Sequence, residues 1–265
     1  MAYRALALDV DGTLICSAQK KISPGTTAAL KELQSRGITI ILSTGRSGYA
    51  STGDILGTDF VPDWRVCTNG ALILDAAGRT VFERRFSFSD VETISAFTAQ
   101  HSLPLTFTYE DAYYIYSNYE EYVAYYTSHS GPVPYLRDGS SRTRHYQSLP
   151  FGAYILEMPV RLRDELAAMC PSIKLMETNP EAYDVSPADT DKKHGVEWVI
   201  SQLGIGFKDL IAVGDSENDR ELLLASGVSV VMGNAPEHVK AYADYVTGSV
   251  VEDGVVTAIE RFFCD

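Results

Sequence analysis

The hydrophobic pattern of the chain has two outer parts that resemble each other. Near the start, two apolar runs, ALALDV (5–10) and ITIILST (38–44), flank a helical pattern. That helical pattern has Ser23 as its N-cap, Pro24 at its first position and Gly37 at its end. Continuous apolar strands that alternate with helices indicate a parallel sheet covered on both faces.

The last quarter of the chain repeats this pattern. Strands are predicted over DLIAVG (209–214) and VSVVM (228–232), and helices over 193–204, over about 217–225, after Pro236, and up to about Phe263. We therefore predict an α/β fold with a doubly wound, Rossmann-like parallel-sheet core that both ends of the chain build together.

The middle of the chain has a different pattern, with short strand-like alternations separated by helical segments. Eleven of the 16 tyrosines lie between Tyr109 and Tyr154, which marks a change of composition. We predict an α+β domain at 85–187, inserted into a core formed by 1–84 and 188–265.

Composition and charge limit the classes of function that the chain can have. With 265 residues and 45% hydrophobic content, the chain is long enough to fold alone. The net charge of −13 excludes non-specific binding to nucleic acid or to an anionic membrane, because both need a basic face. The four cysteines have no CxxC spacing, which predicts reduced thiols, and no long apolar run predicts a membrane span. We expect a soluble, cytoplasmic protein.

Two acids follow the first apolar strand, in the sequence Asp9-Val10-Asp11-Gly12-Thr13. In an extended strand, residues i and i+2 point to the same side, so we expect both carboxylates in one small volume at the strand's carboxyl end. Like charges that close raise each other's pKa, and a hard cation such as Mg²⁺ would resolve the conflict. The alternative is an ordinary Asp- and Gly-rich turn.

Three further stretches narrow this choice. STGR (43–46) follows the second apolar strand with a hydroxyl and a glycine, and DKKHG (191–195) places lysines at a helix start, where they oppose the helix dipole. After another strand, Asp215 and Asp219 stand four residues apart around Asn218. Each stretch alone also suits a common turn or a solvated lysine pair. Two acidic strand ends in one sheet are difficult to explain by structure alone.

Taken together, DVDGT, STGR, DKKHG and GDSENDREL resemble, in this order, the four motifs of the haloacid dehalogenase (HAD) superfamily. The large insert between the second and third motifs, with MGNAPEHVKAYADYVT and EDGVVTAIERF downstream, is similar to the Cof-type, class IIB phosphatases. The resemblance covers the core, whereas the insert matches only in size, position and mixed α/β character.

The resemblance implies a role for each acid. Asp9 is the nucleophile that forms an aspartyl phosphate, and Asp11 is the general acid and then the general base. Mg²⁺ is held by the Asp9 carboxylate, the Asp11 backbone carbonyl and Asp215. Asp219 orients this metal site from outside it.

The resemblance also implies a phosphate site. The backbone N–H groups of Val10 and Gly45 and the hydroxyl of Thr44 bind phosphate, Asn218 donates to it, and Lys192 neutralises both the nucleophile and the phosphoryl oxygens. Thr44 and Lys192 thus complete the catalytic set.

Two positions depart from the family pattern. The motif lysine is assigned to Lys192 and not to Lys193, although the family more often has Lys-Gly and here two residues intervene before Gly195. Ser47 stands where many relatives have proline.

The insert is implied to be a cap that closes over the strand ends and contacts the leaving group. Its tyrosines would stack on a sugar or, as the simpler interpretation, fill a half-buried sheet. Arg142, Arg144 and His145 would bind a distal substrate charge or belong to a solvated loop.

The leading hypothesis is a Mg²⁺-dependent phosphomonoesterase that acts on a small phosphorylated metabolite, with sugar phosphates as the first candidates. The alternatives are a phosphosugar mutase of the same fold and a non-catalytic phosphometabolite sensor. The sequence specifies neither the physiological substrate nor the oligomeric state.

Overall fold

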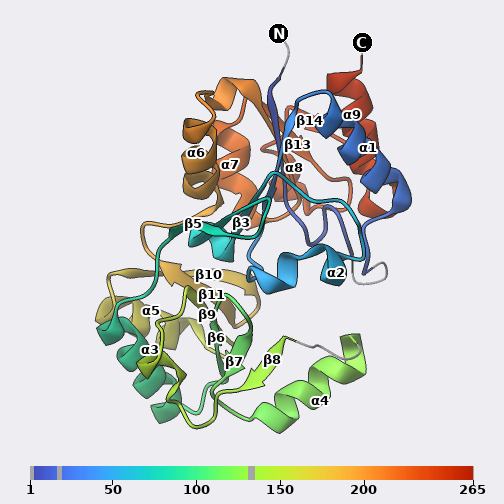
Figure 1. Cartoon of the computed structure of the whole chain (residues 1–265). Coiled ribbons are helices and arrows are strands. Elements are labelled where there is room, and N and C mark those ends of the chain that lie inside the picture. Colours follow the sequence, from blue (N-terminus) through green and yellow to red (C-terminus); the bar gives the residue numbers. More distant parts are fainter. Residues whose placement is uncertain (1–2, 17–19, 131–134, 265) are drawn as a thin grey trace. The chain divides into compact units, whose positions relative to one another are not determined.

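A computed structural model describes residues 3–16, 20–130 and 135–264 of the chain (Figure 1). It divides into two compact units. The first unit comprises Met1–Arg46, Ser51–Val81 and Asp191–Asp265, and the second comprises Ser47–Ala50 and Phe82–Thr190. Most of the second unit is therefore inserted into the sequence of the first.

The larger sheet has strands from both ends of the chain. Its strands are β1 (Ala5–Leu8), β2 (Thr39–Ser43), β3 (Trp64–Cys67), β4 (Leu72–Asp75), β5 (Thr80–Glu83), β12 (Leu210–Gly214), β13 (Val228–Val231) and β14 (Tyr245–Val246). They lie in the order β14-β13-β12-β1-β2-β3-β4-β5. The strands from β14 to β3 are parallel, and β4 is antiparallel to β3.

The register of the central strands brings three strand ends together. Leu8 of β1 lies beside Leu42 of β2 and Val213 of β12. Parallel strands present their carboxyl ends at one edge of the sheet, so the residues that follow β1, β2 and β12 gather there. These residues include Asp9, Thr44 and Asp215.

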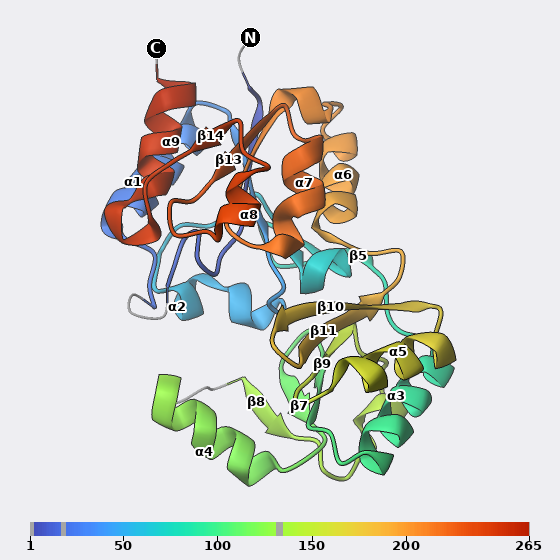
Figure 2. The same ribbon diagram turned by 180° about the vertical axis from the view of Figure 1, so that it is seen from behind.

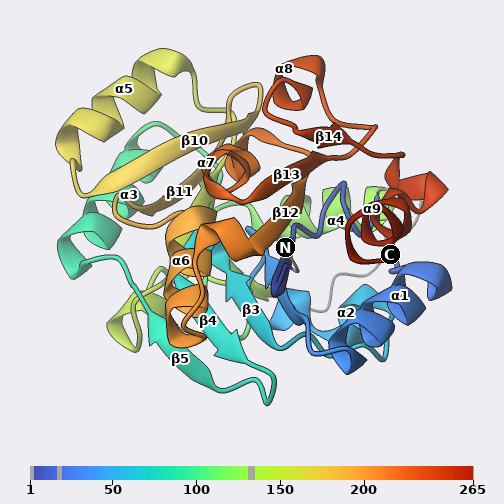
Figure 3. The ribbon, with the colours of Figure 1, turned by 90° about the horizontal axis from the view of Figure 1, so that it is seen from above.

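Helices cover both faces of this sheet. Helices α1 (Pro24–Ser35) and α9 (Gly254–Phe263) pack against the face that carries Leu6 and Leu8, and α6 (Lys192–Gln202) and α7 (Arg220–Ala225) contact the other (Figures 1 and 2). Seen along the sheet from above, the strands run between the two helix layers (Figure 3). The apolar composition of β1, β2 and β12 follows from burial on both sides.

Shorter elements complete the first unit. They are the helices α2 (Gly53–Leu56) and α8 (Glu237–Lys240) and the 3-10 turns η2 (Thr68–Gly70), η4 (Phe207–Asp209), η5 (Glu217–Asp219) and η6 (Val250–Glu252). Turn η2 connects β3 to β4, and η5 leads into α7.

The second unit has its own sheet and core. Its strands are β6 (Leu105–Thr108), β7 (Tyr113–Ile115), β8 (Leu136–Asp138), β9 (Gly152–Ile155), β10 (Ile173–Asn179) and β11 (Ala182–Pro187), in the order β10-β11-β9-β6-β7-β8. All neighbours are antiparallel except β7 and β8. Helices α3 (Phe88–Gln100) and α5 (Val160–Met169) pack on the core, and α4 (Tyr119–Ser130) contacts β8. The 3-10 turns are η3 (Arg144–Tyr146) and η1 (Tyr49–Ser51), whose last residue belongs to the first unit.

The basic residues of 142–145 make contacts within the second unit. Arg142 Nη1 donates to the Ser95 carbonyl at 2.7 Å, and the Arg144 guanidinium lies 4.4 Å from the centre of the Tyr109 ring. His145 is buried and hydrogen-bonded through both ring nitrogens. These contacts favour a structural role for the segment.

The predicted fold class is confirmed: a doubly wound parallel core carries an inserted α/β domain. The N-cap prediction is also confirmed, because the Ser23 hydroxyl accepts from the Thr26 N–H at 3.0 Å. The sequence pattern did not indicate β4, β5 or α4. None of the helices in the described part of the chain is long and apolar enough to span a bilayer.

Candidate active site

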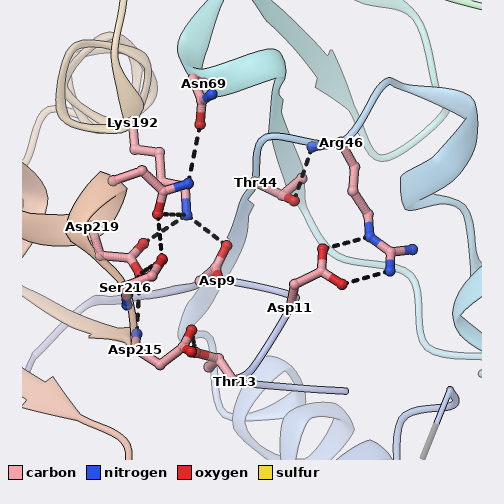
Figure 4. Close-up of polar contacts among 11 residues, drawn as sticks. Asp9, Asp11, Thr13, Thr44, Arg46, Asn69, Lys192, Asp215, Ser216 and Asp219 are labelled. Carbon is pink, nitrogen blue, oxygen red and sulfur yellow. Dashed lines mark hydrogen bonds and ion pairs between the residues drawn. The ribbon is translucent and has the colours of Figure 1, made fainter. Parts of the chain in front are cut away.

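Asp9 and Asp11 follow β1, but their side chains have different partners (Figure 4). Asp9 is 5% exposed, and its N–H donates to the Val213 carbonyl at 3.0 Å. The side chain of Asp11 is 61% exposed. β1 ends at Leu8, before both acids, and the two side chains pair with different cations, Asp9 with Lys192 and Asp11 with Arg46. The charge of Asp11 nevertheless contributes to the raised pKa of Asp9, and the shared volume predicted for the two carboxylates stays a prediction.

Lys192 lies at the centre of the buried charges. It begins α6 directly after the N-cap residue Asp191 and is 1% exposed. Its Nζ lies 2.6 Å from Asp9 Oδ1 and 2.7 Å from Asp219 Oδ1. Lys193, in contrast, pairs with Glu197 at 3.1 Å and is partly exposed. The structure thus directs Lys192, and not its neighbour, toward Asp9.

The loop after β12 brings two more acids to the same place. Asp219 Oδ2 accepts from the backbone N–H groups of Asp215 (3.0 Å) and Ser216 (3.1 Å) and so fixes the loop. Asp215 Oδ1 accepts from the Thr13 hydroxyl at 3.3 Å. Both carboxylate oxygens of Asp219 are therefore bonded, one to Lys192 and the other to the backbone, whereas Asp215 has fewer hydrogen-bond partners within the protein.

These acids outnumber the cation among them. Burial, followed by the charges of Asp219 and Asp215, raises the pKa of Asp9 well above its ordinary value, although Lys192 opposes the shift. Burial and the Asp219 charge likewise raise the pKa of Asp215 to about 6. Burial alone would lower the pKa of Lys192, but Asp219 and Asp9 outweigh it and raise that pKa. The cluster holds more negative charge than one lysine offsets.

A hard cation fits this excess of negative charge. Carboxylate oxygens of Asp9, Asp215 and Asp219 lie within 4.8 Å of one another, and oxygen donors are the ligands that Mg²⁺ prefers. Gly12 provides space beside them, since a Cβ at this position would lie 2.0 Å from Asp215 Oδ2. Its φ of +81° also suits glycine.

The predicted phosphate-binding residues Val10, Thr44 and Gly45 lie in the loops that follow β1 and β2. Thr44 directly follows β2 and is 1% exposed, and its hydroxyl accepts from the Arg46 N–H at 3.2 Å. Gly45 lies between these two residues. The carbonyl of Val10 accepts from the N–H groups of Leu14 (2.9 Å) and Ile15 (3.0 Å), which closes the turn after β1.

Arg46 is a site residue that the sequence interpretation missed. Its Nε and Nη2 donate to the two oxygens of Asp11, each at 2.7 Å, as a bidentate pair (Figure 4). Arg46 follows Thr44 and Gly45 at the carboxyl end of a core strand, and this position alone would have indicated it as a candidate site residue.

Asn218 connects the cluster to a second missed residue. Its Oδ1 accepts from Lys192 Nζ (3.0 Å) and from the Ser216 hydroxyl (2.7 Å), and its Nδ2 donates to Asn69 Oδ1 (3.4 Å). Asn69 belongs to η2 and is 6% exposed. The sequence motifs gave no indication of Asn69, because it lies between the second and third of them.

Comparison with known proteins identifies the family. Residues 6–259 match the model of the haloacid dehalogenase-like hydrolases. The chain belongs to this family. The matched residues include all four motifs, three of them after strands and the third at the start of α6, so the resemblance inferred from the motifs is confirmed.

Several relatives of this HAD-like hydrolase align over nearly its whole length. Phosphatase YwpJ of Bacillus subtilis is 28% identical, with 95% of this chain and 97% of that protein covered. The 5-amino-6-(5-phospho-D-ribitylamino)uracil phosphatase YcsE of the same organism is 24% identical, with 98% and 95% covered. The chain also matches a chloroplastic endoribonuclease, YBEY of Arabidopsis thaliana, at 24% identity over 96% of the chain, but it spans only 45% of that protein.

Solved structures support the fold of the HAD-like chain. A HAD subclass IIB sugar phosphatase superposes with a TM-score of 0.84 at 23% identity, with 99% of this chain and all of that chain covered. At this identity the likeness concerns the fold, including its cap. The roles of individual residues stay predictions.

Proposed function

We propose that this HAD-like hydrolase is a Mg²⁺-dependent phosphomonoesterase that forms a phosphoenzyme on Asp9. The observation that carries the proposal is the buried Lys192 ammonium, 2.6 Å from Asp9 and 2.7 Å from Asp219. A carboxylate that attacks a phosphate must approach another anion. A buried cation beside it, in a cluster that also suits a metal ion, reduces this repulsion.

In the first step, a carboxylate oxygen of Asp9 attacks phosphorus and the bond to the leaving oxygen breaks. Lys192 neutralises the nucleophile and the phosphoryl oxygens. Mg²⁺, held by Asp9, the Asp11 carbonyl and Asp215, would supply further charge compensation at this place. Asp219 fixes the loop that presents Asp215.

Asp11 moves the protons in both steps. It gives a proton to the leaving oxygen, and then takes one from the water that attacks the phosphoenzyme and regenerates Asp9. Its exposed carboxylate lies outside the buried cluster, which suits a group that must reach a leaving group. Arg46 donates to both oxygens of Asp11 and so orients the ionised carboxylate. When Asp11 carries the proton for the leaving group, the protonated oxygen gives up its contact with Arg46 and the other oxygen keeps its own.

The phosphate itself would be bound by the residues at the ends of β1 and β2. The Thr44 hydroxyl and the N–H groups of Gly45 and Val10 provide donors. Asn218 has its Oδ1 occupied by two donors, so its amide presents N–H groups for Asn69 and for a phosphate oxygen.

The proposed substrates are small phosphorylated metabolites, with sugar phosphates first. One structural neighbour is a sugar phosphatase, and one relative is a phosphatase of a phosphoribitylamino-uracil, which is also a polyol phosphate. The net charge of −13 argues against nucleic-acid partners. Cytoplasmic location stays a prediction, which the free thiols of all four cysteines support.

A variant of the nucleophile tests the proposal. We expect Asp9→Asn to abolish hydrolysis of p-nitrophenyl phosphate with the fold retained, because an amide neither attacks phosphorus nor binds metal as a carboxylate does. Asp59→Asn, at an exposed acid that pairs with Lys31, is the matched control and should keep wild-type turnover. Turnover at the wild-type rate, both in Asp9→Asn and in the wild type treated with EDTA, would contradict the mechanism. Phosphoryl transfer to a sugar, in place of phosphate release, would indicate a mutase.

A further inference from the structure

Turn η2, residues 68–70, has an unusual backbone. Thr68, Asn69 and Gly70 have φ angles of 47°, 49° and 91°, so three consecutive residues are in the left-handed region. Only glycine adopts this region readily, asparagine tolerates it, and a β-branched threonine is strained there. A strained turn persists only when its surroundings hold it in place.

The turn holds the loop that follows β2. The Thr68 N–H donates to the Arg46 carbonyl at 2.8 Å, and the Asn69 N–H donates to the Thr44 carbonyl at 3.0 Å. Thr44 is a proposed phosphate ligand, and Arg46 orients Asp11. Two adjacent donors of η2 therefore fix both ends of the Thr44–Arg46 segment.

The turn also packs against the start of α6. A Cβ at Gly70 would lie 2.1 Å from the carbonyl oxygen of Asp191, the residue before Lys192. A Cβ at Gly195 would lie 3.0 Å from the Gly70 Cα. Glycine at both positions lets the two backbones approach closely, and this close approach fixes the start of α6, where Lys192 lies.

The Asn69 side chain reaches a third segment of the site. Lys192 and the Ser216 hydroxyl both donate to Asn218 Oδ1, which orients the amide with its Nδ2 toward Asn69 Oδ1. Asn69 is 6% exposed and accepts this N–H. Turn η2 thus contacts the segments of Thr44, Lys192 and Asn218, which come from three distant parts of the sequence.

We infer that Asn69 is a positioning residue of the phosphate site: its left-handed backbone carries the donor to Thr44, and its side-chain oxygen sets the orientation of the Asn218 amide. The inference rests on the proposed phosphatase function and adds a residue to its machinery. Asn69 contacts neither the phosphate nor the metal in this account, and acts through Thr44 and Asn218.

Asn69→Gly separates the side chain from the backbone, because glycine keeps the left-handed conformation. We expect kcat/KM for p-nitrophenyl phosphate to fall about 10- to 100-fold, with the Tm close to that of the wild type. Asn69→Ala should lower kcat/KM further and also lower the Tm, since alanine resists a positive φ. Asn118→Gly is the matched control, because Asn118 is another left-handed asparagine (φ 52°) in the second unit, and it should leave both quantities unchanged.

A double variant distinguishes positioning from a general structural role. If Asn69 acts through Asn218, Asn69→Gly should cost much less in an Asn218→Ala background, both in kcat/KM and in the inhibition constant of inorganic phosphate. Unchanged kinetics in Asn69→Gly, or the same loss in both backgrounds, would overturn the inference. A wild-type protein without Mg²⁺-dependent phosphatase activity would instead overturn the proposed function on which it rests.

Discussion

Lys192 and Lys193 are neighbours in the sequence but have opposite surroundings. Lys192 is buried between Asp9 and Asp219, whereas Lys193 extends toward Glu197. The helical register decides the difference, because the first turn of α6 directs only one of the two side chains toward the strand ends. The sequence assigns the motif position to Lys192, the lysine that the structure places beside Asp9, but it does not predict that Asp219 would be its second partner.

The two lysines form a matched pair of variants. We expect Lys192→Met to lower kcat for p-nitrophenyl phosphate by roughly 10²- to 10³-fold, because it removes a preorganised buried charge at the nucleophile. Lys193→Met should keep wild-type kcat, since it removes a partly exposed ion pair with Glu197 and a contact 5.6 Å from the centre of the Phe207 ring, neither of which reaches Asp9. Steady-state kinetics of both variants check this, and equal losses in the two would contradict the assignment.

Arg46 shows what residue spacing alone misses. The pattern of a strand followed by Thr-Gly drew attention to the hydroxyl and the backbone, yet the next side chain makes the bidentate contact with Asp11. The sequence indicated that the Asp11 carboxylate lies near that of Asp9, whose pKa its charge helps to raise, but it did not indicate the contact with Arg46.

Substrates with different leaving groups test whether Arg46 orients Asp11. If Arg46 orients Asp11 as the general acid, Arg46→Lys should lower kcat/KM more for an alkyl phosphate than for p-nitrophenyl phosphate, whose leaving group needs little protonation. We expect the two losses to differ by about tenfold or more, within the range that general acid catalysis contributes. Arg79→Lys, at an exposed arginine that pairs with Asp75, is the control. Equal losses for both substrates would contradict the positioning role.

At the scale of elements, strands and helices that carry the motifs were the most predictable. The helix from Ser23 and the strands β1, β2 and β12 follow from apolar runs, caps and turn residues. Turn η2 was not predictable, because its conformation depends on contacts with the Thr44–Arg46 segment and with α6 that are distant in sequence. The pairing of β4 with β3 depends on this turn, because η2 joins the two strands. The helix α4 was missed for a local reason, since its apolar positions have little helical periodicity.

Two glycines with positive φ test the packing of η2 against α6. A Cβ at Gly37 (φ 85°) would point into open space, whereas a Cβ at Gly70 (φ 91°) would strike the Asp191 carbonyl. We expect Gly37→Ala to cost about 1–2 kcal/mol of unfolding free energy, from the backbone alone. Gly70→Ala should cost about 1–3 kcal/mol more, from overpacking, and should also lower kcat. Urea unfolding measures both costs, and equal values would contradict the close approach.

At the scale of the whole molecule, the acidic cluster links stability to pH and metal. The folded chain raises the pKa of Asp215 from 3.8 to about 6, so the folded state holds the proton more tightly than the unfolded state. This contribution to stability is complete below the ordinary pKa and is lost as the pH rises through about 6. Metal binding has the opposite dependence, because protons compete with the cation for the same oxygens.

Thermal unfolding at pH 5 and pH 8 checks this linkage. In EDTA, the Tm of the wild type should fall, relative to the Tm of Asp215→Asn, as the pH rises from 5 to 8. The reason is that the Asp215 carboxyl becomes negatively charged over this range, whereas the amide of the variant stays neutral. Mg²⁺ should raise the wild-type Tm more at pH 8 than at pH 5, and should raise that of Asp215→Asn little. A Mg²⁺ effect that is the same in both proteins would place the ion elsewhere.

The proposed mechanism requires that Asp9 becomes phosphorylated during turnover. In Asp11→Asn the base that activates water is absent, so p-nitrophenyl phosphate should phosphorylate the variant faster than water can release the phosphoryl group. With Mg²⁺ present, mass spectrometry should then find one added phosphoryl group on the intact protein, and peptide mapping should assign it to Asp9. A phosphoryl group on another residue of Asp11→Asn would contradict the mechanism. The absence of any adduct on Asp11→Asn would also contradict it if Asp9→Asn still hydrolyses p-nitrophenyl phosphate.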